Sequence, residues 1–461
     1  MKIVVCVRKG LDGEISPFDA CAYEAALRIK GAEVTLLSMG PLNTKDFLLG
    51  LTRLGAKRAV LLSDGAFAGA DTLSTAYALS LAIKKIAPDL VFCGRQTLIG
   101  DTAQTGAMLS VYAGAELVTN VMEISEATEN EIACKTRGGA EHRAKYPALL
   151  TIERINTLRR PSIMSRVGEV EVWSADDIGA DKSRCGLNGS PTRVIESFEN
   201  TSGRRKCSFV EPSQLKNIVA EALLRQQNAV KAQSTSDKKL NKVFCIGREP
   251  IEYAESICDN VTVIEKQSEE KLCELIKTQM PDAVVWASDD WSKRTSSRVA
   301  ALLNLGLCAD CTALETDGET LYMIRPALAG SVIARIKSLT KPAMATVRTV
   351  SEGADVVVAA GFGAKNSIDR VKALAESLQG SLASSRKLVD NGILPYSMQV
   401  GLTGKTVCPV VYVAVGVSGA VHHIVGMQSA GTVIAINPDK EAPIFDYADF
   451  GIISKIEDLK L

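Results

Sequence analysis

The feature that most constrains the fold is a strand pattern that occurs twice along the 461-residue chain. In both halves, short β-branched runs alternate with segments of helical periodicity, which is typical of parallel α/β sheets. Asp89 opens a strand 58 residues before Pro147, and Asp282 opens one 60 residues before Pro342. The expected strands cover residues 2–7, 33–40, 59–64, 89–94 and 148–153, then 242–247, 260–265, 282–287 and 343–348. The repeat indicates an internal duplication, with chance similarity of two α/β units as the alternative.

The pattern between and after the repeats predicts the domain boundaries. Residues 229–242 are polar and without periodicity, as in a linker, and the second repeat lacks one opening strand–helix unit. A third block begins near residue 353, with strands at 354–361, 411–417 and 432–437 that end at or beside Gly or Asn. The expected parts are an α/β domain with a C-terminal arm (1–227), a linker (228–241), a shortened α/β domain (242–350) and a C-terminal domain (351–461).

Composition excludes several classes of function. Lys and Arg number 53 and Asp and Glu also 53, so neither a nucleic-acid partner nor an acidic substrate is indicated. The chain has only three histidines, and its twelve cysteines stand mostly in apolar runs, which favours reduced core thiols and no metal site. The start reads as a first strand, and no apolar run approaches the roughly 18 residues of a membrane span. We therefore expect a soluble cytoplasmic protein.

Glycine-rich loops follow two strands of the third block. Gly361-Phe362-Gly363 resembles part of a phosphate-binding turn, in which backbone N–H groups approach a diphosphate. The loops 401–406 and 416–420 add hydroxyls and backbone donors without a strong general base. This combination favours binding of a large polar cofactor, and ordinary tight Gly turns are the alternative.

Four longer motifs stand in the same region: Ser385-Arg386-x-x-Val389-Asp390, Gln399-Val400-Gly401-x-Thr403-Gly404-Lys405-Thr406, Gly416-Val417-Ser418-Gly419-Ala420-x-His422-His423 and Ala435-Ile436-Asn437. Together they resemble the α subunit of electron transfer flavoproteins. Residues 1–227 resemble the β subunit through Ser16-Pro17-Phe18-Asp19, Gly94-Arg95-Gln96 and the stretch from Gly100 to Gly106. The resemblance implies two related adenine-nucleotide-hydrolase-like α/β domains and a flavodoxin-like FAD-binding domain, with the two subunits fused in one chain.

The resemblance also implies an FAD site in residues 351–461. Arg386 would lie over the flavin and favour its reduced charge, Thr403 would hydrogen-bond near N5, and His423 would sit near the pyrimidine carbonyl. For His423, a helix-face histidine satisfied by its neighbours is the alternative. The implied cofactor-binding residues are Gly361, Gly363, Ser385, Arg386, Leu402, Thr403, Gly404, Ser418, Gly419, Ala420, His423 and Asn437. Leu402, Phe362 and Lys455 depart from the family pattern, which usually has Gln, Arg and an acidic residue there.

A second nucleotide, either AMP or a second FAD as in electron-bifurcating members, is implied for the N-terminal half. Its expected contacts are Val7, Ser16, Ser38, Gly94, Asp101, Thr102, Gln104, Thr105 and Arg325. A helix capped by Asp101 or Thr102 is the alternative reading of the stretch that begins at Gly100.

The expected function is that of an electron carrier rather than an enzyme in its own right. FAD would shuttle electrons between a flavin dehydrogenase and an acceptor, with NADH as donor if electrons are bifurcated. The segment 159–166 aligns with the region that docks dehydrogenases but lacks its lysine-rich tail. A homodimer or a complex with the dehydrogenase is expected. The competing hypothesis is a non-redox nucleotide-binding sensor or scaffold of the adenine-nucleotide-hydrolase-like type.

Overall fold

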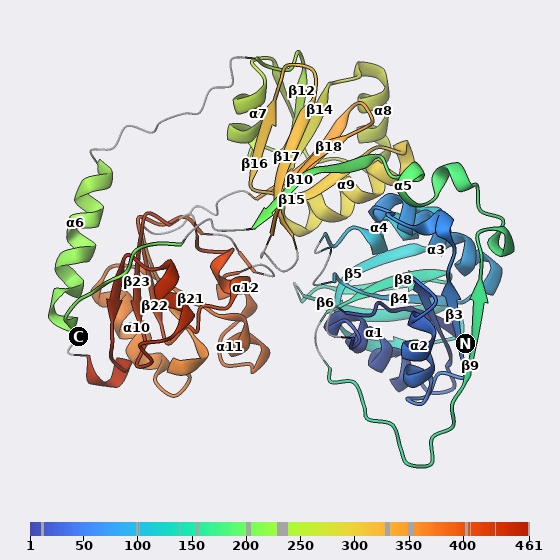
Figure 1. Cartoon of the computed structure of the whole chain (residues 1–461), viewed down its shortest axis with the longest axis horizontal. Coiled ribbons are helices and arrows are strands. Elements are labelled where there is room, and N and C mark those ends of the chain that lie inside the picture. Colours follow the sequence, from blue (N-terminus) through green and yellow to red (C-terminus); the bar gives the residue numbers. More distant parts are fainter. Residues whose placement is uncertain are drawn as a thin grey trace. The chain divides into compact units, whose positions relative to one another are not determined.

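The chain forms two compact units (Figure 1). A computed structural model describes residues 1–10, 13–97, 100, 102–137, 139–153, 156–199, 204–227, 238–327, 332–348, 355–401, 404–405, 407–428 and 430–459. The first unit comprises Met1–Ser197, Ser236–Leu328 and Ala334–Val347, and the second comprises Phe198–Thr235, Ala329–Ile333 and Arg348–Leu461. Among the described residues, no helix has the length and apolar character that crossing a membrane requires.

The first unit contains a nine-stranded sheet with the order β7-β6-β5-β8-β4-β1-β2-β3-β9. The strands are β1 (Lys2–Cys6), β2 (Glu33–Met39), β3 (Arg58–Leu62), β4 (Leu90–Gly94), β5 (Glu116–Ala127), β6 (Glu131–Thr136), β7 (Glu141–Lys145), β8 (Ala148–Ile152) and β9 (Glu169–Trp173). Helices α1 (Pro17–Arg28) and α2 (Thr44–Thr52) pack on one face, and α3 (Thr72–Ile86) and α4 (Thr105–Ala113) pack on the other. The central strands are parallel and buried on both faces. Such strands are continuous apolar runs in the sequence, which predicted the ends of these strands to within two residues.

A second, five-stranded parallel sheet in this unit has the order β13-β12-β14-β19-β15. Its elements are β12 (Val243–Ile246), α7 (Ile251–Ile257), β13 (Val261–Ile264), α8 (Glu269–Gln279), β14 (Ala283–Ala287), α9 (Asp290–Leu303), β15 (Leu307–Cys311) and β19 (Ala343–Val347). The pairing of β14 with β19 matches that of β4 with β8, as a duplication predicts. One hydrophobic cluster runs through both sheets and includes Leu109 of α4 and Val299 of α9.

A small sheet absent from the sequence-based expectation has the order β10-β18-β17-β16. Its strands are β10 (Thr192–Glu199), β16 (Ala313–Thr316), β17 (Leu321–Ala327) and β18 (Val332–Ser338). The buried cysteines Cys308 and Cys311 both lie on β15, where the Cys311 thiol donates to the Cys308 carbonyl at 3.6 Å. This Cys-x-x-Cys pair is therefore part of a strand in the core.

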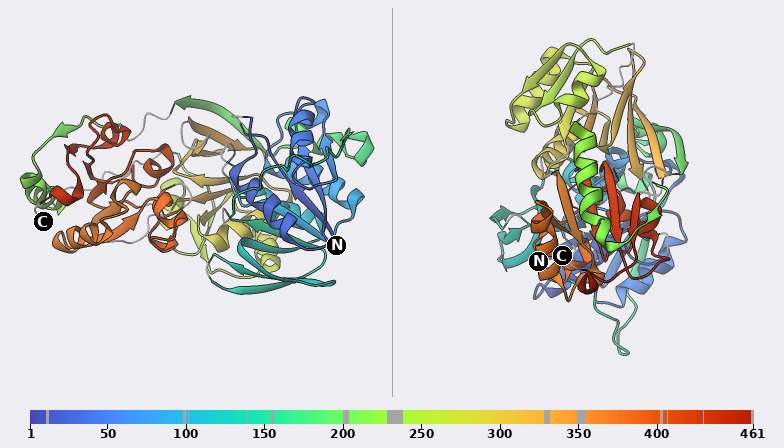
Figure 2. Two further views of the ribbon diagram at one scale, coloured as in Figure 1. Left: turned by 90° about the horizontal axis from the view of Figure 1, so that it is seen from below. Right: turned by 90° about the vertical axis from the view of Figure 1, so that its left-hand side faces the viewer.

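The second unit is built on a six-stranded parallel sheet with the order β11-β24-β23-β22-β20-β21 (Figure 2). The strands are β11 (Ser208–Phe209), β20 (Val356–Ala360), β21 (Ser381–Ser384), β22 (Val411–Val415), β23 (Thr432–Ile436) and β24 (Phe450–Ile452). Helices α6 (Leu215–Gln227) and α10 (Ile368–Ser377) cover one face, and α12 (Val421–Ile424) lies on the other. Helix α12 is only four residues long. Both α/β units agree with the expected fold class, while the exact domain boundaries stay a prediction.

Candidate functional site

The strand order of the second unit fixes where a ligand can bind. When β11 is left out and the other strands are numbered along the chain, their order in the sheet is 2-1-3-4-5. The order reverses between the neighbours β20 and β22, and the helices that follow them, α10 and α12, pack on opposite faces of the sheet. In open parallel sheets of this order, ligands bind outside the carboxyl ends of the two strands at which the order reverses. The loops that begin at Gly361 and Gly416 leave the sheet at this point.

These two loops bind tightly to each other. The Gly361 N–H donates to the Val415 carbonyl at 2.7 Å, and the Gly363 N–H donates to the Gly416 carbonyl at 3.0 Å. A Cβ on Gly361 would lie 2.1 Å from the Gly416 oxygen, and Gly416 has a φ of +63°. The glycines are therefore required for the close approach of the loops. The N–H groups of Gly361 and Gly363, expected to face a diphosphate, are used within the protein.

The loop of residues 417–420 supplies the open backbone donors instead. Its carbonyls are engaged, since Val417 accepts from Asn437 Nδ2 at 3.0 Å and Ser418 accepts from the Ile444 N–H at 3.2 Å. Within the described part of the chain, the N–H groups of Ser418, Gly419 and Ala420 donate to no other group. Successive unpaired N–H groups in a turn form a concave site for anions such as phosphate.

Asn437 holds this loop in place. Besides donating to Val417, its amide oxygen accepts from the Asp439 N–H at 3.0 Å, and the side chain is buried. Both ends of the amide are therefore engaged, and the structure assigns Asn437 to shaping the loop.

Ser385 and Arg386 follow β21 at the same edge of the sheet. Ser385 is the N-cap residue of α11 (Arg386–Asp390), yet its buried hydroxyl makes no hydrogen bond with a described group. The Arg386 guanidinium lies 3.4 Å from the Asp390 carboxylate and stays partly exposed. The edge thus carries an unsatisfied hydroxyl beside a permanent positive charge.

His423 on α12 is buried against β22. Its Nε2 lies 2.9 Å from the Tyr412 hydroxyl, while Nδ1 is buried and has no hydrogen-bond partner among the described residues. Burial lowers the pKa of His423 to about 4, against a smaller opposing effect of the Val400 backbone. At neutral pH the ring is therefore uncharged, and it carries one proton.

The loop from Gln399 to Lys405 reaches the same edge. The Val400 N–H donates to the Ser384 carbonyl at 2.9 Å, and a Cβ on Gly401 would lie 2.5 Å from the His422 oxygen. Gly404 is equally confined, because a Cβ there would lie 2.2 Å from the Gln399 oxygen. Leu402 and Thr403, expected beside the flavin, lie outside the described residues.

The first unit has a second strand-order reversal, between β1 and β4. Asp19 joins the two loops that follow these strands, because its carboxylate accepts the Arg8 N–H at 2.9 Å and the Gly94 N–H at 3.2 Å. Burial raises the pKa of Asp19 to about 7. Sequence reasoning placed Asp19 in a motif but assigned it no role, because its contact with Gly94 spans 75 residues.

The expected contacts of the second nucleotide fall into two groups. Gly94, Ser16 and Arg325 lie at this loop pair: the buried Ser16 hydroxyl has no described partner, and Arg325 donates to the Gly100 carbonyl at 3.0 Å. Gln104 is instead engaged elsewhere, accepting from the Thr72 hydroxyl at 3.0 Å and donating to the Leu307 carbonyl at 3.5 Å.

The remaining expected contacts are Val7, Ser38, Asp101, Thr102 and Thr105. Val7 and Ser38 are buried, and the Val7 N–H donates to the Leu37 carbonyl at 2.9 Å. Helix α4 begins at Thr105 with Gln104 as its N-cap, so the alternative of a cap at Thr102 is wrong. Asp101 lies outside the described residues.

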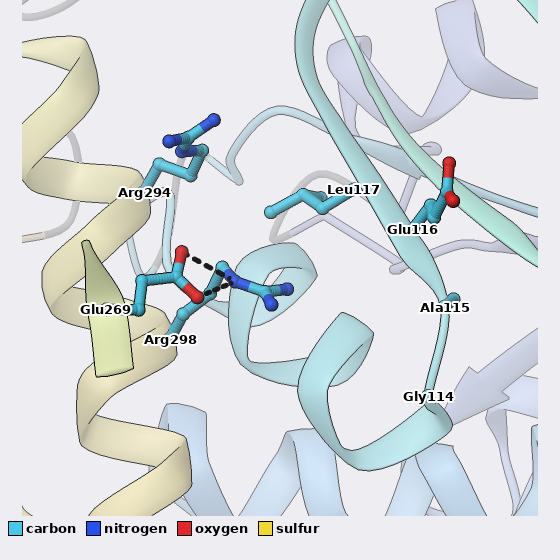
Figure 3. Close-up of a pocket in the computed structure, with 7 residues that line it drawn as sticks. All are labelled: Gly114, Ala115, Glu116, Leu117, Glu269, Arg294 and Arg298. Carbon is cyan, nitrogen blue, oxygen red and sulfur yellow. Dashed lines mark hydrogen bonds and ion pairs between the residues drawn. The ribbon is translucent and has the colours of Figure 1, made fainter. Parts of the chain in front are cut away.

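A cavity of about 440 Å³ in the first unit lies between the end of α4 and helices α8 and α9 (Figure 3). It is lined by Gly114, Ala115, Glu116, Leu117, Glu269, Arg294 and Arg298. Arg298 Nε donates to both oxygens of Glu269, at 2.8 and 2.7 Å. None of the expected nucleotide contacts lines this cavity.

Comparisons with known proteins agree with these two regions. The chain matches the family model "Electron transfer flavoprotein domain" over residues 3–178 and 263–373, and "Electron transfer flavoprotein FAD-binding domain" over residues 351–428. The second match spans the loops after β20, β21 and β22.

Relatives match both halves of the chain. It is 42% identical over 200 residues to the electron transfer flavoprotein subunit beta of Thermoanaerobacterium thermosaccharolyticum, covering 41% of this chain and 77% of the relative. It is 33% identical over 232 residues to the electron transfer flavoprotein subunit alpha of the same organism, and the match covers 40% of this chain and 70% of the relative. It is also 38% identical over 206 residues to the caffeyl-CoA reductase-Etf complex subunit CarD of Acetobacterium woodii, and the match covers 42% of this chain and 78% of the relative.

Proposed function

Because the chain belongs to the electron transfer flavoproteins, with β-like and α-like parts fused in one polypeptide, we propose that it carries electrons from a flavin dehydrogenase to an acceptor. The observation that carries this proposal is the set of unsatisfied groups at the carboxyl edge of the second unit's sheet. They are the N–H groups of residues 418–420, the Ser385 hydroxyl and His423 Nδ1. Buried polar groups without partners are costly, so a polar ligand at this edge would satisfy them.

These groups fit the parts of FAD. The open N–H groups of residues 418–420 suit a diphosphate, and the Ser385 hydroxyl and the neutral His423 ring suit the oxygens of a flavin or ribityl group. The Arg386 guanidinium keeps its charge at any physiological pH and stabilises negative charge near it. FAD, when bound, would supply the redox chemistry, while these residues bind and orient it.

The loops after β1 and β4 are proposed to hold the second adenine nucleotide. Asp19 joins the two loops through hydrogen bonds. The Arg325 guanidinium donates to the Gly100 carbonyl and so places a positive charge at the site. AMP and FAD share the adenosine phosphate that such a site would bind. The resemblance of the stretch from Gly100 to Gly106 to electron-bifurcating members of the family favours a second FAD with NADH as electron donor.

The dehydrogenase is proposed to dock on the segment 159–166. Ile163 is 97% exposed and Met164 is 86% exposed, and Arg159 and Arg166 flank them. Large apolar side chains gathered on a projecting segment mark an interaction site. Because the lysine-rich tail is missing, the proposed partner is a flavin dehydrogenase other than a conventional fatty-acid dehydrogenase.

Two glycine substitutions test the FAD site. Gly419 has a φ of +91°, and a Cβ there would lie 2.2 Å from the Ile444 nitrogen, so Gly419→Ala must displace the loop of residues 417–420. Gly392 has a φ of +69° but nothing within 4 Å of a Cβ, which makes Gly392→Ala a matched control. We expect at least a tenfold loss of FAD affinity, measured by flavin fluorescence, in the first variant only.

Two outcomes of this titration would contradict the proposal. One is equal FAD binding by both variants, which would remove the loop of residues 417–420 from the site. The other is a wild-type protein that binds no FAD, which would favour the non-redox sensor or scaffold.

A further inference from the structure

Tyr412 and His423 form a buried pair beneath the proposed FAD site. Tyr412 lies on β22 with no exposed surface, and His423 on α12 is 6% exposed. The Tyr412 hydroxyl oxygen and His423 Nε2 are 2.9 Å apart. Within the described part of the chain, Tyr412 makes no other hydrogen bond, and His423 Nδ1 has no partner with hydrogen-bond geometry, although the Val400 backbone lies close enough to act on the ring.

The proton count of this pair determines the tautomer of the histidine. A tyrosine hydroxyl has one proton to donate, and a neutral imidazole has one donor nitrogen and one acceptor nitrogen. If Nε2 carried the proton, it would donate to the Tyr412 oxygen and leave the tyrosine proton buried without an acceptor. Burying a donor without an acceptor destabilises the folded protein. The Tyr412 hydroxyl therefore donates to Nε2, and the ring proton resides on Nδ1.

The protonation states of both groups support this arrangement. Burial lowers the pKa of His423 to about 4, so the ring is neutral at pH 7. Burial also raises the pKa of the Tyr412 hydroxyl, which keeps its proton. The pair then has one unsatisfied donor, the Nδ1–H, which is buried and without a described partner.

We propose that Tyr412 is a positioning residue, which fixes His423 in the tautomer whose Nδ1–H is available to a carbonyl oxygen of the bound cofactor. This inference rests on the proposed function only for the identity of the acceptor. A fixed donor costs no reorganisation when negative charge develops on its acceptor, so the pair would favour the reduced cofactor. Without the Tyr412 hydroxyl, the two tautomers of His423 would compete.

The tautomer is measured directly by NMR. Long-range ¹H–¹⁵N correlation of ¹⁵N-histidine-labelled protein separates protonated from unprotonated ring nitrogens, and the chain has only three histidines. His423→Gln assigns the signals, and the exposed His142 serves as an internal reference. In the cofactor-free wild type, we expect a protonated Nδ1 and an unprotonated Nε2 for His423. A protonated Nε2 would overturn the inference.

Tyr412→Phe gives the second readout. In this variant we expect a mixture of His423 tautomers, a lower flavin midpoint potential and about fivefold weaker FAD binding. The control variant Tyr447→Phe, in the same unit, should leave the tautomer, the potential and the affinity unchanged. An unchanged tautomer and potential in Tyr412→Phe would overturn the inference. If the wild type shows the expected tautomer but binds no FAD, the proposed function fails and the assignment of the pair stands.

Discussion

At the scale of single residues, two buried titratable groups link pH to stability with opposite signs. His423 has a folded pKa of about 4, below its usual value of 6.5, so its neutral form is favoured in the folded state. The contribution of the neutral His423 ring to folding stability is complete above about pH 6.5 and is lost as the pH falls towards 4. We expect the wild type to lose up to about 3 kcal/mol more than His423→Gln between pH 7 and pH 4. Hydrogen exchange of the β22 amides measures the difference, and parallel pH curves would contradict it.

For Asp19, we predict the opposite dependence of folding stability on pH. Its folded pKa of about 7 lies above its usual value of 3.8, so the protonated carboxyl is favoured in the folded state. The contribution is complete below about pH 4 and is lost as the pH rises through 7. Relative to Asp19→Asn, we expect the wild type to lose roughly 2–4 kcal/mol between pH 4 and pH 8, measured by exchange of the β1 and β4 amides. A difference that does not change with pH would show that Asp19 is ionised throughout.

At the scale of elements, Arg205 helps to hold the segment before α6 against the sheet of the second unit. The Arg205 guanidinium donates to the Ala430 carbonyl at 2.5 Å and the Gly431 carbonyl at 2.8 Å, and it pairs with the Asp449 carboxylate. Nearby, β11 pairs with β24 through only two residues. We expect Arg205→Ala to cost about 2–4 kcal/mol, because it leaves Asp449 and two carbonyls without this partner.

Hydrogen exchange of the Ser208 and Val210 amides, which donate to Asp449 and Gly451, measures the effect. The exposed neighbour Arg204 provides a matched control in Arg204→Ala. Equal exchange in the two variants would show that β11 does not depend on Arg205.

The elements that the sequence predicted are those whose own residues carry the signal. Buried parallel strands such as β1 and β22 are near-continuous apolar runs, so composition marks them. Strand β11 has two residues and β10 is largely exposed, so neither has a recognisable pattern. The loops at Gly361 and Gly416 were predicted from motifs. The role of Tyr412 was not, because in the sequence it is one more apolar strand residue, and its partner is brought to it by the fold.

At the scale of the whole molecule, the nine-stranded sheet of the first unit and the six-stranded sheet of the second unit each reverse their strand order beside a glycine-containing loop pair. In the second unit, this pair has open backbone donors and unsatisfied side chains, and the FAD-binding family match covers it. In the first unit, Asp19 and Arg325 reach the equivalent loops. We therefore propose that each chain binds two nucleotides, of which FAD in the second unit is the redox centre.

The nucleotides bound to each chain can be counted by denaturing the purified protein and quantifying what it releases. We predict one FAD from the second unit, together with a second nucleotide that is AMP in a simple carrier or FAD in a bifurcating protein. Removal of the second nucleotide should leave the first FAD bound. A preparation that releases no FAD, and takes up none when incubated with it, would contradict the claim.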